Sequence, residues 1–309
     1  VVHHHQLKQH FRFNTEVTGA VFDEVNKEWV VNTIDKDGIE ERYVANSVIS
    51  AVGQLNRPVF PDIPGIDSFA GQWCHSAAWD DSIDCRGKKV VVVGSGASAF
   101  QLVPTIAADV GQLTVFQRSA PWMFENPIYH TEVPQGKKWC LQNLPFYTRW
   151  FRFLIFWPAC DGAYETVFVD PEWSHQERSI NEMNDFVYQM FLDHIKSQVG
   201  DDEELLKKVT PDYAPMGKRT LQDNGSWLSA LKRENVDLVT QGVASVSAGG
   251  VTAGDGTFYP ADIVIYATGF ETDKFLWPME IKGRGGKLLS DKWGIEPSAY
   301  LGITVSDQI

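Results

Sequence analysis

Residues 88–99 read Lys88-Lys89-Val90-Val91-Val92-Val93-Gly94-Ser95-Gly96-Ala97-Ser98-Ala99. The four consecutive valines predict a strand that is buried on both faces of a sheet. This strand leads directly into Gly-x-Gly-x-x-Ala, and apolar residues recur through 100–107 at helical spacing. Pro104 lies inside the predicted helix and should bend it or limit its length. The order of strand, glycine turn and helix is typical of a dinucleotide-binding unit.

The turn residues have predicted roles in binding a pyrophosphate. Gly94 permits the tight turn, Gly96 has no side chain to block the ligand, and Ala99 lets the helix pack closely on the strand. The N–H groups at the helix start then face the phosphates. The residues predicted to bind are Gly94, Ser95, Gly96, Ala97, Ser98 and Ala99. The alternative is a glycine turn that serves only the fold of an α/β protein.

The next predicted strand, residues 113–116, indicates which nucleotide binds. Its end is the place where an NAD-binding fold carries an acidic residue for the ribose hydroxyl. Here the chain has Gln117-Arg118-Ser119 instead. The arginine and the serine suit a 2′-phosphate, because a guanidinium can bind it with two hydrogen bonds, so the sequence favours NADP(H) over NAD(H). Gln117, Arg118 and Ser119 are therefore predicted to bind the cofactor. The alternative for Arg118 is an ordinary solvated surface charge.

Composition excludes several classes of protein. The net charge of −13 argues against a nucleic-acid partner. The four cysteines show neither CxxC nor metal-ligand spacing, so we expect reduced thiols, no metal site and a cytoplasmic location. No signal peptide or transmembrane segment is predicted. The apolar run 151–157 is interrupted by Arg152 and stopped by Pro158, and its length favours a buried helix or substrate-side wall over contact with a membrane surface.

The chain is long enough for about two domains. Alternating apolar residues predict an antiparallel meander near the start and a buried strand ending in small residues at 47–53. A dinucleotide-binding domain is expected over 58–257, with a helical insertion over about 120–213. A second buried strand, 261–269, also ends in small residues. The flanking segments 1–57 and 258–309 are expected to form the other domain.

One segment before the glycine turn carries a family resemblance. Residues 69–80 fit F-x-G-x-x-x-H-x-x-x-W-D through Phe69, Gly71, His75, Trp79 and Asp80. This pattern resembles the fingerprint of Baeyer–Villiger monooxygenases, which use NADPH and FAD to convert ketones into esters or lactones with O₂. The resemblance implies a flavoprotein fold with two dinucleotide-binding domains, one of them Rossmann-like. It also implies that these five residues couple the domains rather than perform the chemistry.

Two later segments match the same family. Lys218-Arg219 is similar to the family's Lys-Arg pair, which implies that Lys218 contacts the 2′-phosphate beside Arg118. It also implies that Arg219 is catalytic and stabilises the negatively charged flavin peroxide. An arginine stays charged in a dry pocket where a lysine can lose its proton. Thr268 and Gly269 end a segment similar to the family's second hinge strand. The alternative for Lys218-Arg219 is an exposed surface pair.

The aromatic insertion and residues 218–227 resemble the 4-hydroxyacetophenone monooxygenase branch, which implies aryl or cyclic ketone substrates. The family's first glycine motif, which binds the FAD diphosphate, is not found before residue 60. The chain ends at Ile309, where the family continues. We therefore expect an internal piece of such an enzyme, with 1–57 and 258–309 as parts of its FAD domain.

Two alternatives remain open at this point. One is an N- or S-oxygenating flavin-containing monooxygenase, which needs a related flavin intermediate; Trp79-Asp80 speaks against it. The other is a non-catalytic NADP(H)-binding protein, which the missing glycine motif supports. A dinucleotide-disulfide reductase would need a redox cysteine pair, which this sequence lacks.

Overall fold

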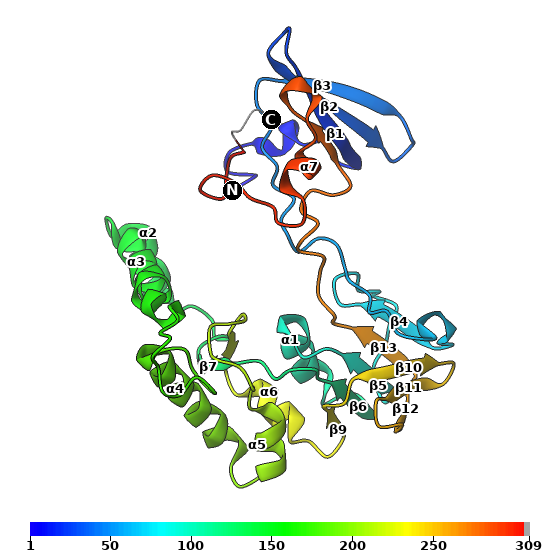
Figure 1. Ribbon diagram of the computed structural model, residues 1–309, viewed down its shortest axis with the longest axis vertical. Coiled ribbons are helices and arrows are strands. Elements are labelled where there is room, and N and C mark those ends of the chain that lie inside the picture. The colour runs from blue at the N-terminus through cyan, green and yellow to red at the C-terminus, as the bar shows by residue number, and fades with distance from the viewer. Residues whose placement is uncertain (306–309) are drawn as a thin grey trace. The chain divides into compact units, whose positions relative to one another are not determined.

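The computed structural model describes residues 1–305, which divide into two compact units (Figure 1). Unit 1 combines residues 1–59 with the described residues from Phe270 onward, and unit 2 is Phe60–Gly269. The chain therefore leaves unit 1, builds the whole of unit 2, and then returns.

Unit 2 is built on a five-stranded sheet in which all neighbours are parallel. The strand order is β4-β13-β5-β6-β9. The strands are β4 (Gln72–His75), β13 (Ile263–Tyr266), β5 (Lys89–Val93), β6 (Gln112–Phe116) and β9 (Val236–Val239). The predicted valine strand is confirmed as β5, and Val90 to Val93 are all buried, as a central parallel strand requires.

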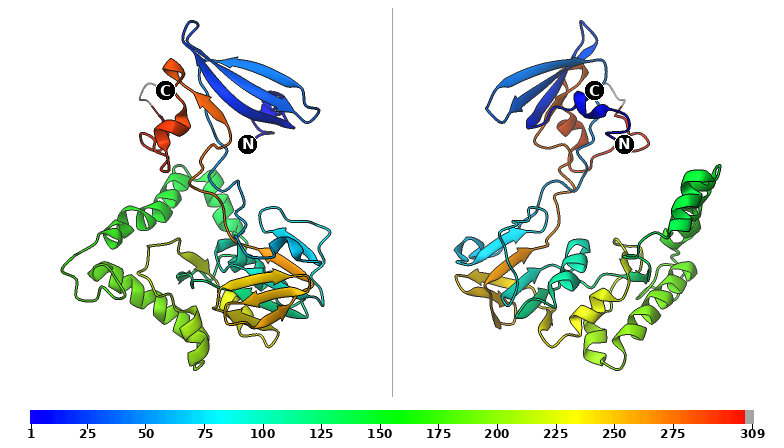
Figure 2. Two further views of the ribbon diagram at one scale, coloured as in Figure 1. Left: turned by 45° about the vertical axis from the view of Figure 1, so that its right-hand side comes forward. Right: turned by 180° about the vertical axis from the view of Figure 1, so that it is seen from behind.

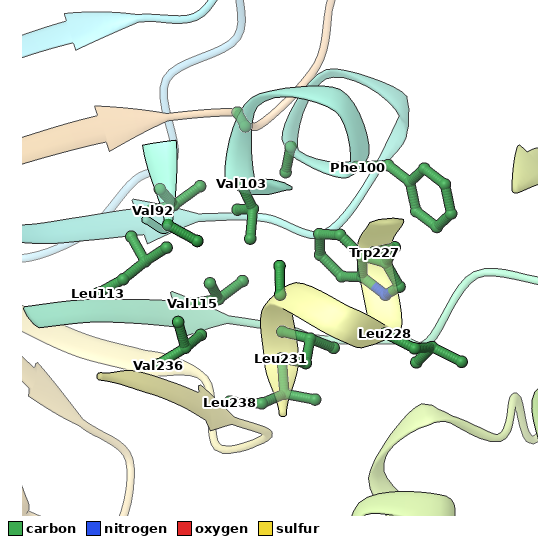
Figure 3. Close-up of a cluster of buried hydrophobic side chains, with 14 of the residues drawn as sticks. Val92, Phe100, Val103, Leu113, Val115, Trp227, Leu228, Leu231, Val236 and Leu238 are labelled. Carbon is green, nitrogen blue, oxygen red and sulfur yellow. The ribbon is translucent and has the colours of Figure 1, made fainter. Parts of the chain in front are cut away.

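Helices cover one face of this sheet. They are α1 (Ala97–Ile106), which contains Pro104 two residues before its end, and α6 (Ser226–Leu231). Figure 3 shows how Phe100 and Trp227 pack together beside the valines and leucines of the sheet. Their rings are stacked with centroids 5.0 Å apart, and Trp227 is fully buried. Aromatic burial of this kind stabilises the packing of α1 against α6.

The other face carries a small antiparallel sheet (Figure 2). Its strands are β10 (Val243–Ser247), β11 (Gly250–Ala253) and β12 (Phe258–Pro260). The 3₁₀-helix η2 (Ile66–Ser68), from much earlier in the chain, contacts β10. Val91 and Val264 of the central strands pack here against Val251 and Val246. The parallel sheet is thus buried on both faces, which leaves its strand ends as the place where a ligand has access.

A helical segment is inserted between β7 (Met123–Glu125) and β8 (Leu221–Asp223), which pair in parallel. It consists of α2 (Gln135–Asn143), α3 (Tyr147–Ala159), the 3₁₀-helix η3 (Asp161–Val167), α4 (Glu182–Val199) and α5 (Glu203–Val209). Side chains of Asn181 and Asp202 cap α4 and α5 by accepting hydrogen bonds from Asn184 N and Leu205 N. The expectation that 151–157 forms a buried helix is wrong, because no residue of α3 is buried.

Unit 1 contains a four-stranded sheet in the order β14-β1-β2-β3. The predicted antiparallel meander is confirmed by β1 (Thr15–Asp23), β2 (Glu28–Asp35) and β3 (Glu40–Ala45), while β14 (Glu280–Lys282) pairs in parallel with β1. The remaining elements are η1 (Leu7–His10), η4 (Arg284–Gly286) and α7 (Leu289–Trp293).

Two expectations about strands near the unit boundaries differ from the structure. Residues 47–53 form no strand, and Ile49 is 90% exposed, because no strand among residues 1–305 pairs with this segment. The sequence predicts residues 258–269 in the domain of 1–57, but they belong to unit 2. The reason is that β13 is hydrogen-bonded to both β4 and β5 inside the parallel sheet.

Candidate dinucleotide-binding site

The carboxyl ends of the five parallel strands meet at one edge of unit 2. In register, the row runs His75, Tyr266, Val93, Phe116 and Val239. The chain passes outward from β5 to β6 and β9, then returns to β13 on the other side of β5. Open α/β sheets bind ligands outside such a reversal point. The residues that follow β5 and β13 are therefore the centre of the candidate site.

The glycine turn after β5 needs a glycine at position 94. Gly94 has φ of +112°, and a Cβ there would lie 2.4 Å from the Ala267 carbonyl oxygen. Its N–H donates a 2.9 Å hydrogen bond to the Phe116 carbonyl oxygen. The turn is thus packed between the ends of β6 and β13, and any side chain would push it away from them.

Gly96 and the start of α1 have the form of an anion cradle. Gly96 is the N-cap of α1, and no side chain caps the first N–H groups of the helix. A Cβ built on Gly96 meets no atom within 4 Å, so the space above it is open. Ala99 is fully buried against the sheet, which fixes the direction of the helix. Uncapped N–H groups facing open space, including those that follow at Ala97 and Ser98, fit a pyrophosphate.

The segment after β6 is tied to this turn. The Ser95 hydroxyl donates a 3.1 Å hydrogen bond to the Ser119 carbonyl oxygen. Gln117 is 3% exposed, and its amide donates a 2.7 Å hydrogen bond to the Lys208 carbonyl oxygen at the end of α5. Gln117 therefore positions the backbone, while Arg118 beside it is exposed.

Lys218 is held near the same segment by an aromatic residue that the sequence did not mark. Its ammonium lies over the Tyr213 ring, 4.2 Å from the centroid. The Tyr213 hydroxyl donates a 3.1 Å hydrogen bond to the carbonyl oxygen of Ala120, two residues after Arg118. Trp122 donates a further 2.8 Å bond from Nε1 to the Tyr213 carbonyl oxygen. The loop that carries Lys218 is thus bonded to the chain that follows Arg118.

The site has cations without acidic partners. Arg118, Lys218 and Arg219 are all exposed, and none forms an ion pair with any of residues 1–305. A guanidinium or ammonium that is not neutralised by the protein is available for a phosphate. Tyr213 connects Lys218 to the segment of Arg118, because its ring contacts the Lys218 ammonium and its hydroxyl is bonded to Ala120. For Arg219 it shows an exposed position on the same loop and no contact that assigns a role.

A buried carboxylate anchors the strand that follows Lys218 and Arg219. Asp223, the last residue of β8, is 0% exposed and accepts hydrogen bonds from His194 Nε2 at 3.0 Å and Gln198 Nε2 at 2.8 Å. Its other oxygen accepts the Gly225 N–H at 3.0 Å. Sequence reasoning missed this group. The only available signal was the i, i+4 spacing of His194 and Gln198 on one face of α4.

The first half of the fingerprint builds the sheet. Phe69 is buried in the core, and its ring lies over Gly71. A Cβ on Gly71 would lie 2.6 Å from Phe69 Cζ and 2.4 Å from the Asp262 carbonyl oxygen. Asp262 immediately precedes β13, so this close approach positions β4 beside β13.

His75 connects the fingerprint to the end of β13. It is 1% exposed, and its Nδ1 accepts a 3.1 Å hydrogen bond from Ala77 N. Burial lowers the pKa of His75, and a hydrogen bond with the Gly269 backbone opposes this shift. A neutral ring, which burial favours, has a free lone pair at Nδ1 to accept the Ala77 N–H. Gly269, with φ of +90°, is the last residue of unit 2, and Thr268 precedes it.

Trp79 and Asp80 follow the turn at the end of β4. Trp79 is 40% exposed. Asp80 is exposed, and hydrogen bonds from Ser82 lower its pKa. Of the five fingerprint residues, Phe69 and His75 are thus buried, whereas Gly71, Trp79 and Asp80 are exposed.

A cavity of about 640 Å³ lies beside the end of β9. Its lining includes Lys208 of α5, Val239 and Thr240 at the strand end, and Tyr259 of β12. Lys208 is also the residue whose carbonyl oxygen holds Gln117. Sequence patterns alone do not reveal this cavity, because α5 and β12 lie far apart along the chain.

Comparisons with known proteins agree with this architecture. Residues 1–137 match the family described as flavin-binding monooxygenase-like. The monooxygenase y4iD of Sinorhizobium fredii is 36% identical over 97% of this chain and 45% of its own length. A Baeyer–Villiger monooxygenase of Pseudomonas aeruginosa is 30% identical over 98% of this chain and 54% of its own. The chain thus spans about half the length of these curated relatives.

A solved structure gives the same result for the fold. Cyclohexanone monooxygenase from Rhodococcus sp. Phi1, in a crystal structure bound to NADP⁺, superimposes with a TM-score of 0.78 at 29% identity. The match covers 99% of this chain and 61% of that one. Among residues 1–305, every helix is too short or too polar to cross a bilayer. The predicted two-domain flavoprotein fold is confirmed, and the chain is homologous to flavin-binding monooxygenases that include Baeyer–Villiger enzymes.

Proposed function

We propose that unit 2 binds NADP(H) across the Gly94 turn. The observation that carries this proposal is the hydrogen bond from Ser95 to Ser119, which joins an open pyrophosphate cradle to the segment of the exposed Arg118. The pyrophosphate would bind residues 94–99, and the 2′-phosphate would bind Arg118 and Lys218. Gln117 and Ser119 would position this segment, and Thr268 and Gly269 would border the nicotinamide side of the site.

We further propose that the chain serves an NADPH- and FAD-dependent monooxygenase that inserts one oxygen atom of O₂ beside a ketone carbonyl. The homology to Baeyer–Villiger monooxygenases supports this reaction. Within residues 1–59 no strand is followed by a glycine turn and a helix, so this segment offers no such cradle for the FAD diphosphate. The similarity of residues 1–137 to flavin-binding monooxygenases supports FAD as the second cofactor. When bound, FAD would supply the chemistry that activates O₂.

Residues 218–227 and the aromatic insertion support the 4-hydroxyacetophenone monooxygenase branch, and the proposed substrates are aryl or cyclic ketones. Arg219 is the proposed catalytic residue, since its permanently charged guanidinium would stabilise negative charge that develops beside the nicotinamide. Phe69, Gly71, His75, Trp79 and Asp80 would couple the two units, because His75 contacts Gly269 where the chain leaves unit 2.

The test uses the purified chain supplied with FAD. A yellow protein that bleaches on adding NADPH, and that forms an ester from an aryl ketone in air, supports the full proposal. Oxygenation of an amine or sulfide without ester would instead indicate an N- or S-oxygenating enzyme. A colourless protein that still binds NADPH would indicate a non-catalytic NADP(H)-binding protein, which the absent cradle in residues 1–59 favours.

A further inference from the structure

Helix α3 exposes large apolar side chains to solvent. Phe153, Leu154, Ile155, Phe156 and Trp157 are between 45% and 54% exposed, and Trp150 is 56% exposed. None of the helix's 13 residues is buried. In Figure 1 and the right-hand view of Figure 2, α2 and α3 lie at the end of unit 2 opposite β4. A contiguous apolar surface of this kind marks an interaction site.

The aromatic rings of α3 are arranged as a continuous stack. Trp150 and Phe153 have centroids 5.4 Å apart, and Phe153 and Trp157 have centroids 5.6 Å apart. Their spacing of three and four residues places them on one side of the helix. The opposite side is anchored to α2, where the Thr148 hydroxyl donates a 2.8 Å hydrogen bond to the Leu141 carbonyl oxygen. The stack is therefore a rigid surface that points away from its own support.

Basic residues accompany these rings, and acidic residues do not. Between Glu132 and Asp161 the sequence contains Lys137, Lys138, Arg149 and Arg152 but neither Asp nor Glu. This segment carries +4 in a chain whose net charge is −13. Such a local reversal of charge is complementary to an anionic partner.

Three of these cations lie over aromatic rings. Lys137 is 4.0 Å from the Phe151 centroid, Arg152 is 4.7 Å from that of Phe156, and Arg149 is 5.9 Å from that of Phe146. Arg149 and Arg152 form no ion pair with any of residues 1–305. Their charges are thus available outside the protein, beside the rings that would enter an apolar phase.

We propose that α2 and α3 bind an anionic lipid surface, with α3 lying in the interface. Its rings and aliphatic side chains would enter the region between headgroups and acyl chains, and the four cations would contact lipid phosphates. A helix of 13 residues spans about 20 Å, which is shorter than the hydrocarbon core, so α3 lies on the membrane and does not cross it. A neutral surface would use the rings but leave the four cations without partners.

The test is co-sedimentation of the chain with vesicles. Phosphatidylcholine vesicles containing about a quarter phosphatidylglycerol should bind the protein, pure phosphatidylcholine vesicles should bind it far more weakly, and added salt should release it. The double variant R149Q/R152Q should lower the partition coefficient roughly 25-fold. The double variant F153S/W157S should lose binding to both kinds of vesicle. All these positions are exposed, so far-ultraviolet circular dichroism should stay unchanged.

The matched control removes two cations elsewhere. Lys36 and Lys88 are exposed outside α2 and α3, so K36Q/K88Q makes the same change in net charge and should bind vesicles as the wild type does. Equal losses in R149Q/R152Q and K36Q/K88Q would overturn the proposal, as would the absence of binding to anionic vesicles. A wild-type dimer that F153S/W157S converts to a monomer, without vesicle binding, would show that a second copy covers this face instead.

Discussion

The Ser95 hydroxyl and the Ser119 carbonyl oxygen are joined by a 3.1 Å hydrogen bond across the ends of two adjacent parallel strands. One partner belongs to the glycine turn and the other immediately follows Arg118. The bond therefore fixes the distance between a site for a pyrophosphate and a cation suited to a 2′-phosphate. A nucleotide that carries both groups would be bound at two places whose spacing the protein has already set.

Gly94 and Gly96 are predicted to respond differently to alanine. At Gly94 the added Cβ would meet the Ala267 carbonyl oxygen at a left-handed backbone position, so G94A should lower the free energy of unfolding by about 2 to 4 kcal/mol. At Gly96 the Cβ meets no protein atom, so G96A should unfold within about 0.5 kcal/mol of the wild type. It should still weaken NADPH binding, as measured by calorimetry, because the Cβ occupies the space proposed for the pyrophosphate. Normal affinity in G96A would contradict the cradle.

Gly71 is predicted to be required for packing. In G71A the Cβ would collide with Phe69 and with the Asp262 carbonyl oxygen, so chemical denaturation should show a loss of about 1 to 3 kcal/mol. Gly136 is the control, since it lies in α2 and a Cβ there meets nothing within 4 Å. G136A should stabilise the helix by about 0.5 to 1 kcal/mol. Equal effects of the two substitutions would refute the packing role of Gly71.

His75 is predicted to make unit 2 sensitive to acid. Its pKa is lowered in the folded protein. Below about pH 6.5 the unfolded chain therefore binds a proton at His75 more readily than the folded chain does. Stability should therefore fall as pH drops below 6.5, by at most about 1.4 kcal/mol per pH unit, and should show no such loss at higher pH. Denaturation curves between pH 7 and 5 should give a flatter pH dependence for H75Q. The exposed His130 is the control, and a slope unchanged in H75Q but reduced in H130Q would reverse the assignment.

Arg219 is predicted to act on the reaction and not on cofactor affinity. In the enzyme supplied with FAD, R219A should retain NADPH binding and reduce ester formation by about 100-fold or more, because the charge that stabilises the reacting centre is lost. R219K should recover part of the rate, since it restores a positive charge without the planar guanidinium. Both quantities are obtained from calorimetry and from product analysis by gas chromatography. Full activity in R219A would remove the residue from the proposed mechanism.

Local patterns in the sequence were sufficient for the core of unit 2. Four valines followed by Gly94 specify a buried strand and a tight turn from short-range preferences alone, and the structure has both. The caps of α4 and α5 are equally local, because Asn181 and Asp202 each accept a hydrogen bond from an N–H three residues later. Such features need no knowledge of the rest of the fold.

Features that depend on distant neighbours could not be predicted in this way. Residues 47–53 have the composition of a buried strand, but a strand also needs a partner, and none of residues 1–305 supplies one. Tyr213 holds Lys218 near Ala120 through contacts across 93 residues of chain, which no spacing rule reveals. The exposure of α3 was missed for the same reason, since an apolar helix looks alike in sequence whether it is covered or not.

The central claim is that cations from two distant segments bind the 2′-phosphate of a nucleotide lying across the Gly94 turn. The most direct measurement is the affinity of the wild type, R118A and K218A for NADPH and for NADH, by calorimetry. Each substitution should weaken NADPH binding about 10- to 100-fold and leave NADH binding unchanged, because only NADPH carries the extra phosphate. Equal losses for both cofactors, or no loss for either, would contradict the claim.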